Sequence, residues 1–469
     1  MAVISSPTYD PQTTATNLAT SYIAGTKAIL DDQSSTATAM TSALSSLGSA
    51  LSTFQSSISA LASTTSSLTA TKATFDNSLI GSATAKSTAV ASNYSFYVQQ
   101  LATAGQVAYG GITDATAAGA GQLTVTLADG TDFQIDLANA DSNFDGTLSA
   151  KEIAAAINVA AANNSRVTAS TVTVNGASTI VLTSNQTGAA NAASLDTSGV
   201  TDAGLKAQLD DPANQQQVVT AQDAVVWLGA QTTGTKIQQA SNVFNVIDDV
   251  SMTFTKAQLP GDAPVTLTVA PDNSTTASNV QAFVDAYNKL NTALDALTTQ
   301  GDPSATPPVP AGPLANDSGL LSLRTRMQAA LRTVTGGQSL ISFGLSGQRD
   351  GSLALDTGRL NKAIAANPGA LDNLFGRAAT GAETGALGTL DTLVQQWTNS
   401  ATGQITTRNA SLTKQQQDIT DRQAVLQTQY DNAYKRYLAQ FTALQQLQAQ
   451  MSGNSDLFTA LFSSSSSSS

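Results

Sequence analysis

The chain of 469 residues contains neither cysteine nor histidine. Without cysteine it can form no disulfide bond, thiolate nucleophile, zinc–thiolate site or iron–sulfur cluster, so cysteine usage favours neither redox compartment. Without histidine it can form no Ser-His-Asp or Cys-His catalytic group and no metal site held by imidazole. Only carboxylates, lysine, tyrosine and serine remain as groups that could do chemistry.

Charged residues are also scarce, at 12% of the chain, and 33 Asp and Glu against 21 Lys and Arg give a net charge of −12. No basic cluster is visible, so nucleic acid and anionic membrane surfaces would be repelled. Residues 1–30 lack a basic start followed by an apolar block. No stretch approaches the roughly 20 apolar residues that a membrane span needs. We therefore expect no nucleic-acid partner, no membrane span and no cleaved apolar signal.

Small neutral residues dominate the chain, which has room for about three domains. Near the N-terminus they surround apolar residues spaced 4-3-4-3-4-3-7, and this heptad seam predicts a helix that buries one narrow stripe. The seam residues are Met40, Leu44, Leu47, Leu51, Phe54, Ile58, Leu61 and Leu68.

A second heptad seam lies near the C-terminus and predicts a helix about 70 Å long. Its first register consists of Ile405, Leu412, Ile419, Leu426 and Ala433, and its second register of Tyr430, Tyr437, Leu444 and Met451. Asn409, Gln416 and Gln423 weaken the early second register, so this helix needs partner helices. The two helices could be ordinary core helices of one domain, but their period near 3.5 favours a stalk in which the two ends pair.

Between the two seams the pattern changes to short alternating strands. Residues 121–138 predict a hairpin around Ala128-Asp129-Gly130, and residues 168–184 predict another around Asn175-Gly176. A helical run over 150–164 separates them, so a β-β-α-β-β module occupies roughly residues 112–205.

A second strand region covers residues 236–270, with a predicted hairpin across Pro260-Gly261. It should pair with an early strand over 92–102, which has no other partner nearby, and this pairing predicts a nested insertion. The segments expected to follow are helices over 277–299 and 317–333, a Pro-rich loop over 301–313, a short hairpin and helix through 376, a tail of Gly and Thr, and the long C-terminal helix.

The predicted fold class is α+β, with long terminal helices pairing as a coiled-coil stalk and nested β-rich head domains inserted between them. The expected divisions are a terminal helical stalk (1–45 and 400–469, with a disordered serine tail over 463–469), a helical leg domain (46–78 and 276–399), a β-rich head domain (79–111 and 220–275) and an outer β-β-α-β-β head domain (112–219).

Residues 141–152 read DSNFDGTLSAKE and match the EF-hand calcium pattern. Oxygen ligands recur at the required interval, Gly146 permits the sharp turn, and Leu148 would anchor the loop. The predicted calcium ligands are Asp141, Asn143, Asp145, Thr147, Ser149 and Glu152. The alternative is a capping box at the start of a helix, formed by Ser149 and Glu152. We favour a structural calcium ion and expect no other cofactor.

Other polar or aromatic features carry a weaker signal. The adjacent carboxylates Asp210-Asp211 and Asp248-Asp249 are more simply solvated turns than acid/base pairs, because neighbouring strand residues point to opposite faces. Trp227 and Trp397 fit packing anchors better than ligand stackers. We expect the protein not to be an enzyme.

The order of several segments resembles the flagellar filament cap proteins, also called flagellar hook-associated protein 2. The resemblance lies in residues 42–61, 94–106, 245–258, 280–294, 312–328, 339–375 and 433–453. Each segment is common in composition, but their order and spacing together are specific.

The resemblance implies a homo-oligomeric ring at the distal tip of the bacterial flagellum, with the paired helices as legs and the strand domains as a plate. Flagellin would be held beneath it, fold and insert. Implied partners are flagellin, the hook–filament junction proteins and an export chaperone, and the implied export is by the flagellar type III route to the cell exterior.

The alternative function is an extracellular calcium-dependent adhesin on the same stalk and head. The residues predicted to make coiled-coil or oligomer contacts are Leu44, Leu47, Leu51, Phe54, Ile58, Leu61, Ile405, Leu412, Ile419, Leu426, Tyr430, Tyr437 and Leu444.

Overall fold

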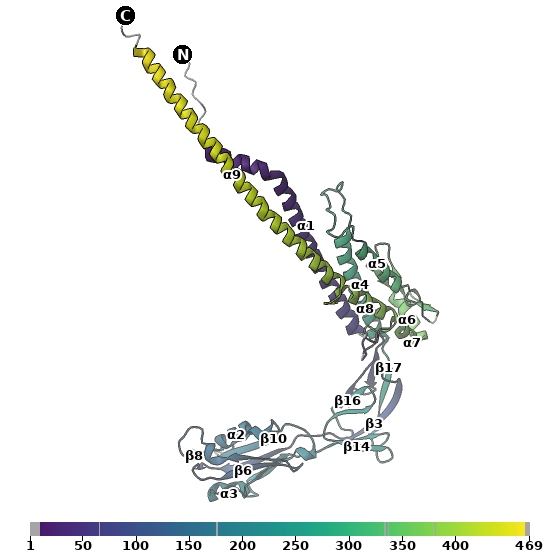
Figure 1. The fold of residues 1–469 in the computed structure, drawn as a ribbon. Helices are drawn as coiled ribbons and strands as arrows, with labels where there is room; N and C mark the ends of the chain where they lie inside the picture. Colours follow the sequence, from purple (N-terminus) through teal and green to yellow (C-terminus); the bar gives the residue numbers. More distant parts are fainter. Residues whose placement is uncertain are drawn as a thin grey trace. The chain divides into compact units, whose positions relative to one another are not determined.

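The computed structural model describes residues 10–64, 66–174, 177–332, 334–335, 337–379 and 381–464. The chain divides into two compact units: Met1–Leu68 with Ala277–Ser469 (unit 1), and Thr69–Thr276 (unit 2). Long helices begin and end the described chain, and a strand-rich segment is inserted between them (Figure 1). The predicted α+β class with long terminal helices is confirmed.

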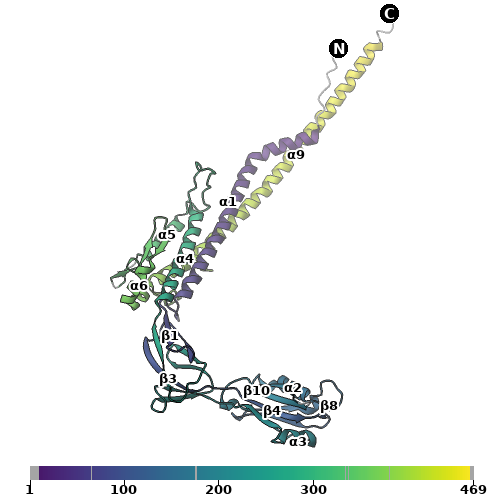
Figure 2. The ribbon, with the colours of Figure 1, turned by 180° about the vertical axis from the view of Figure 1, so that it is seen from behind.

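Helix α1 (Pro11–Leu61) and helix α9 (Gln404–Ser464) run side by side in both views of the molecule (Figures 1 and 2). The Asp10 carboxylate caps α1 by accepting from Thr13 N at 2.9 Å, and Pro11 occupies the first turn, where its missing N–H costs nothing. Helix α1 thus begins well before the predicted seam. Leu68, the last predicted seam residue, lies beyond its end as a buried core residue.

The rest of unit 1 is a helical domain built around the C-terminal half of α1. The prediction of a Gly and Thr tail before the last helix was wrong. This segment contains helix α8, whose Leu387, Leu390 and Val394 are fully buried. The elements are α4 (Asn273–Thr298), α5 (Ser318–Ala330), β18 (Val334–Thr335), β19 (Gln338–Ser339), η4 (Leu340–Phe343), β20 (Leu345–Gly347), β21 (Leu353–Leu355), α6 (Thr357–Ala366), α7 (Pro368–Phe375) and α8 (Gly385–Thr398).

Unit 2 contains a five-stranded antiparallel sheet in the order β1-β17-β3-β13-β14 and a three-stranded sheet in the order β15-β16-β2. The three aromatic residues Phe96, Phe244 and Phe254 are buried in the core of these sheets. The strands are β1 (Thr71–Phe75), β2 (Gly81–Ala85), β3 (Ser92–Gln100), β13 (Ala224–Leu228), β14 (Thr235–Gln239), β15 (Val243–Ile247), β16 (Val250–Phe254) and β17 (Val265–Pro271).

The pairing of the early strand β3 with β17 confirms the nested insertion. The hairpin predicted across Pro260-Gly261 was wrong, because β16 and β17 belong to different sheets. Strand β16 pairs instead with β15 across Asp248-Asp249, where Asp249 adopts φ +60°. A two-residue turn closes that hairpin at a lower loop-closure cost than the longer irregular segment around Pro260 would.

The remaining part of unit 2 has a separate apolar core. Both predicted hairpins are present, as β6 with β7 and as β9 with β10. In the turn of the first hairpin, Gly130 has φ +86°. Asn175 and Gly176, in the turn of the second, lie outside the described residues. The elements are β4 (Gln106–Ile112), β5 (Ala115–Thr116), β6 (Gln122–Leu127), β7 (Asp132–Asp136), η1 (Leu137–Asn139), β8 (Thr147–Leu148), α2 (Ala150–Val159), η2 (Ala161–Asn163), β9 (Val167–Val174), β10 (Ala177–Ser184), η3 (Ala189–Asn191), β11 (Ala193–Asp196), α3 (Ala203–Asp210) and β12 (Gln215–Val219).

The predicted division into four domains stays a prediction. Of the serine tail, Ser463 and Ser464 belong to α9, and the last five serines lie outside the described residues. No helix in the described ranges is long and apolar enough to cross a membrane.

Candidate functional site

The seam of α1 lies mostly inside the helical domain. Five of its predicted residues are 2% exposed or less: Leu44, Leu47, Leu51, Phe54 and Ile58. Phe54 packs edge-on against Tyr287 of α4, with 6.4 Å between the ring centroids. Leu61 is half-buried against the same core. These side chains are already enclosed by their own chain. Their predicted role in contacts between copies stays a prediction, whereas their packing within one chain is observed.

The seam of α9 joins the two helices in antiparallel fashion. Gln416 Nε2 donates to Thr41 Oγ1 at 3.3 Å, and Arg422 donates to Gln33 Oε1 at 3.3 Å. Leu412, Ile419, Leu426 and Ala433 are buried, and Ile405, Tyr430 and Tyr437 are half-buried. Away from the helical domain, the apolar contact of the pair is thin. One small cluster is formed there by Ile23, Leu30 and Leu426, with Tyr430 against them, and most of the other buried residues are alanines.

The C-terminal part of α9 extends past the beginning of α1. Because the helices are antiparallel and α1 begins at Pro11, the first turn of α1 lies alongside α9 near Leu444. From there on, the apolar side chains of α9 are 41 to 65% exposed: Leu444, Leu447, Met451, Leu457, Phe458 and Leu461. Five of them, without Leu457, continue the heptad spacing. The described part of α1 does not extend alongside this stripe.

The loop over residues 141–152 is ordered by its own side chains. Asp141 Oδ2 accepts from Gly146 N at 2.9 Å, and Asp145 Oδ1 accepts from Thr147 N at 2.8 Å. Gly146 has φ +82°, as the predicted sharp turn requires, and Leu148 is fully buried as the predicted anchor. The Thr147 hydroxyl bond lowers the pKa of Asp145 below its ordinary value.

Glu152 closes this loop through a capping box at the start of α2. Its Oε2 accepts from Ser149 N at 3.0 Å, and its Oε1 accepts from Ser142 N at 3.2 Å. The backbone N–H of Ser149 is the largest cause of a lowered Glu152 pKa. Asp141 Oδ1 is buried without a hydrogen bond. Among the described residues, no three Asp or Glu side chains converge to hold a metal ion, so the calcium site stays a prediction.

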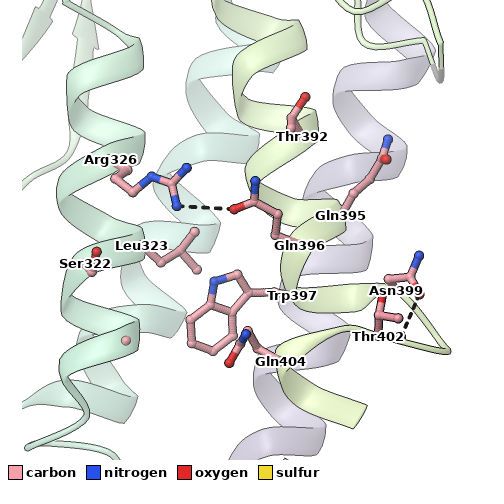
Figure 3. A pocket seen from close by; sticks show the side chains of 11 residues that line it. Ser322, Leu323, Arg326, Thr392, Gln395, Gln396, Trp397, Asn399, Thr402 and Gln404 are labelled. Atoms are coloured by element: carbon pink, nitrogen blue, oxygen red, sulfur yellow. Dashed lines mark hydrogen bonds between the residues drawn. The ribbon is translucent and has the colours of Figure 1, made fainter. Parts of the chain in front are cut away.

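A pocket of about 620 Å³ lies in unit 1 between α5, α8 and the beginning of α9 (Figure 3). Trp397 lies in it as a buried packing residue, as predicted, and the Arg408 guanidinium stacks 4.8 Å from its ring. Arg326 donates to Gln396 Oε1 at 3.2 Å across the pocket. The lining combines Arg326 with neutral side chains such as Gln395 and Thr402.

This pocket was missed at the sequence level because α8 was read as a tail. The signal was present in the spacing of Leu387, Leu390, Val394 and Trp397, which place apolar side chains on one helical face. The glycines Gly385 and Gly388 obscured it, since glycine is unfavourable inside a helix.

Comparison with known proteins identifies relatives along most of the chain. A family model described as "Flagellar hook-associated protein 2 N-terminus" matches residues 8–105, and one described as "Flagellar hook-associated protein 2 C-terminus" matches residues 221–453. The unmatched residues between them contain the separate apolar core described above for the part of unit 2 from β4 to β12.

The lateral flagellar hook-associated protein 2 of Vibrio parahaemolyticus is 31% identical over 374 residues, which cover 79% of this chain and 81% of that protein. The B-type flagellar hook-associated protein 2 of Pseudomonas aeruginosa is 29% identical over 378 residues, covering 77% and 76%. The crystal structure of the D1-D2-D3 domains of the flagellar cap protein FliD from Escherichia coli superposes with a TM-score of 0.60 at 26% identity, covering 79% of this chain and 99% of that one. Sequence and fold therefore agree, and the chain belongs to the flagellar hook-associated protein 2 family.

Proposed function

We propose that this protein caps the distal end of the bacterial flagellar filament as a homo-oligomer and promotes the folding and insertion of flagellin. The observation that carries the proposal is the match to the lateral flagellar hook-associated protein 2 over about four fifths of both chains. The E. coli protein with a similar fold is a flagellar cap protein. The proposed role involves no catalysis.

The geometry of α1 and α9 supports this role physically. A cap that stays in place while subunits are added beneath it needs contacts that form and break repeatedly. The thin apolar cluster around Leu30 and Leu426, on otherwise small polar helices, suits weak contacts of this kind. The exposed stripe from Leu444 to Leu461 offers a surface for them.

Further parts of the proposal concern export and partners. We propose export by the flagellar type III route without a cleaved signal, with an export chaperone, and contact with flagellin and the hook–filament junction proteins at the flagellar tip. The adhesin alternative gains no support, because the reported relatives are hook-associated and cap proteins.

Deletion of the gene tests the proposed function. Cells without the protein should release flagellin monomers into the medium and grow no filaments, and the full-length gene supplied in trans should restore filaments. A chain truncated after Ala443 is a sharper test, because it removes the exposed stripe while keeping the buried part of α9, and it should fail to restore filaments. Normal filaments in the deletion strain would refute the role.

We also propose that the loop over 141–152 binds a structural calcium ion. The spacing of its ligands and the unpartnered Asp141 Oδ1 support this site. Binding would require Glu152 to exchange its Ser149 and Ser142 donors for the ion. Calcium titration by calorimetry should give heat that Asp141→Asn abolishes, and absence of heat at millimolar calcium would leave the capping box as the role of this loop.

A further inference from the structure

A second pocket in unit 1 combines an apolar wall with cationic groups. It has a volume of about 430 Å³ and lies between α4, the end of α5 and the β20–β21 hairpin. Its apolar wall is formed by Leu331, Leu340, Ile341, Leu345 and Leu353. A wall of this size accommodates an apolar side chain of a bound segment.

Three polar side chains of this pocket have no hydrogen-bond or ion-pair partner within the described residues: Tyr287, Arg332 and Arg349. Their neighbour Arg324 differs, because it is paired with Asp295 at 2.5 Å. Burial raises the pKa of Tyr287, so its hydroxyl remains a donor at neutral pH. Two free guanidinium groups and one hydroxyl are suited to a carboxylate, which arginine binds through paired N–H donors.

An unused acceptor lies beside the same pocket. Asn291 is 6% exposed, and its Oδ1 is buried without a hydrogen bond, while its Nδ2 donates to Asp350 O at 3.2 Å. A Cβ placed on the pocket residue Gly351 would lie 3.0 Å from Asn291 Oδ1 and 3.0 Å from Gln328 Nε2. A buried acceptor left unpaired costs free energy, so the wall of the pocket at Gly351 is not fully satisfied within the described residues.

The charge of the chain indicates what fills the pocket. Residues 318–362 contain six Arg and Lys but only two Asp, in a chain whose net charge is −12. A second copy therefore offers a mainly acidic surface to this cationic part. Complementary charge of this kind orients and selects a partner.

We propose that this pocket binds an acidic segment of a second copy of this chain. Arg332 and Arg349 hold a carboxylate of that segment, and the leucine wall takes the apolar side chain next to it. The inference rests on the proposed function, because it takes the homo-oligomer from there and assigns one of its contacts.

Charge reversal in the full-length protein tests this contact. Arg332→Glu and Arg349→Glu should each shift the midpoint of self-association, measured by sedimentation velocity, to a concentration about tenfold higher or more. Lys362→Glu is the matched control, because it makes the same charge change on the exposed face of α6 outside the pocket. It should move the midpoint by less than about twofold. Should a reversal variant lose its circular dichroism signal, Arg332→Gln and Arg349→Gln give the same readout.

Cross-linking identifies the occupant. A photoreactive residue at Ile341, which is exposed at the pocket, should join ¹⁵N-labelled to unlabelled copies at a peptide that contains Asp or Glu. Pocket variants that associate like the wild type would overturn this inference and leave the proposed homo-oligomer standing. Cross-links confined to one copy, or to peptides without an acidic residue, would do the same. A wild-type protein that stays monomeric at every concentration would refute the proposed homo-oligomer as well.

Discussion

Asp391 on α8 is 2% exposed, yet among the described residues no lysine or arginine pairs with it. Its Oδ1 accepts from Gln55 Nε2 of α1 at 2.8 Å, and its Oδ2 accepts from Gln395 Nε2 at 2.7 Å. A buried carboxylate is costly unless its oxygens have donors, so these two glutamines stabilise the packing of α1 on α8.

Replacing Gln55 by leucine removes one of these donors. Gln55→Leu should lower the free energy of unfolding by about 1–3 kcal/mol, because Asp391 Oδ1 would stay buried without a partner. Urea denaturation followed by the helical circular dichroism signal measures the change. Gln415→Leu, at an exposed position of α9, is the control and should cost less than about 0.5 kcal/mol. Equal effects of the two variants would contradict this account of Asp391.

Asp129 in the β6–β7 turn predicts a pH effect. The Thr131 hydroxyl, the Thr131 N–H and then Arg166 lower its pKa from the ordinary 3.8 to about 2. A depressed pKa in the folded state means that the carboxylate stabilises the fold above pH 3.8, and that this contribution is lost as the pH falls from about 4 to about 2.

Carboxyl NMR titration of the whole protein should therefore place the Asp129 midpoint near 2. In Thr131→Val the midpoint should rise toward 3.8, because the largest cause of the shift is removed. In Asp129→Asn the loss of stability over that pH interval should become smaller. An ordinary midpoint in the unaltered protein would show that the Thr131 bond does not form in solution.

At the scale of elements, α1 is divided between two environments. Its C-terminal half has large apolar residues enclosed by α4 and α8, whereas its N-terminal half meets α9 through few apolar side chains. Local stability follows buried apolar contact, so the two halves of one helix should open independently.

Leu30→Ala tests this division of α1, because Leu30 is 1% exposed in the small cluster with Leu426. Hydrogen exchange should accelerate in residues 11–37, by an amount equivalent to about 2–3 kcal/mol of local opening, and stay unchanged around Phe54. Ile29→Ala, at an exposed neighbouring position, should leave exchange unchanged. Acceleration along all of α1 would mean that the helix opens as one unit.

At the scale of the whole molecule, unit 2 is a contiguous segment whose two ends meet. Strand β1 near its beginning pairs with β17 near its end, and Ala70 N donates to Thr276 Oγ1 at 2.9 Å. The unit also has apolar cores of its own. A segment with adjacent ends and its own cores has what a domain needs to fold alone.

The excised segment Thr69–Thr276 should accordingly fold by itself. It should show β-type circular dichroism, and its cooperative thermal unfolding should match that of the same residues in the full chain. The fluorescence of Trp227 follows unfolding in both, with Trp397→Phe in the full chain so that Trp227 is its one tryptophan. A fragment that lacks residues 69–75, and with them β1, is the control and should be less stable. An excised segment that stays unfolded would show that unit 1 is needed for its folding.

Local patterns carried much of the prediction from sequence. The heptad spacing located both terminal helices, and alternation with glycine turns located two hairpins, because these signals depend on residues close together in the chain. The hairpin across Pro260-Gly261 failed because sheet membership depends on partners far away. Helix α8 was missed because its glycines obscured the apolar spacing that its sequence contains. The turn at Gly146 and the anchor Leu148 followed from loop spacing, whereas the calcium ligands stay untested.

The sequence by itself determined the absence of cysteine and histidine chemistry, the periodicity of both long helices and the acidic balance of the chain. Only the tertiary structure decided that Leu44 to Ile58 face a domain core, that the apolar side chains from Leu444 to Leu461 are exposed, and that Tyr287, Arg332 and Arg349 line one pocket. The physical reason is that helical and turn preferences act between near neighbours in the chain. The surroundings of a side chain, in contrast, are set by packing between segments far apart in it.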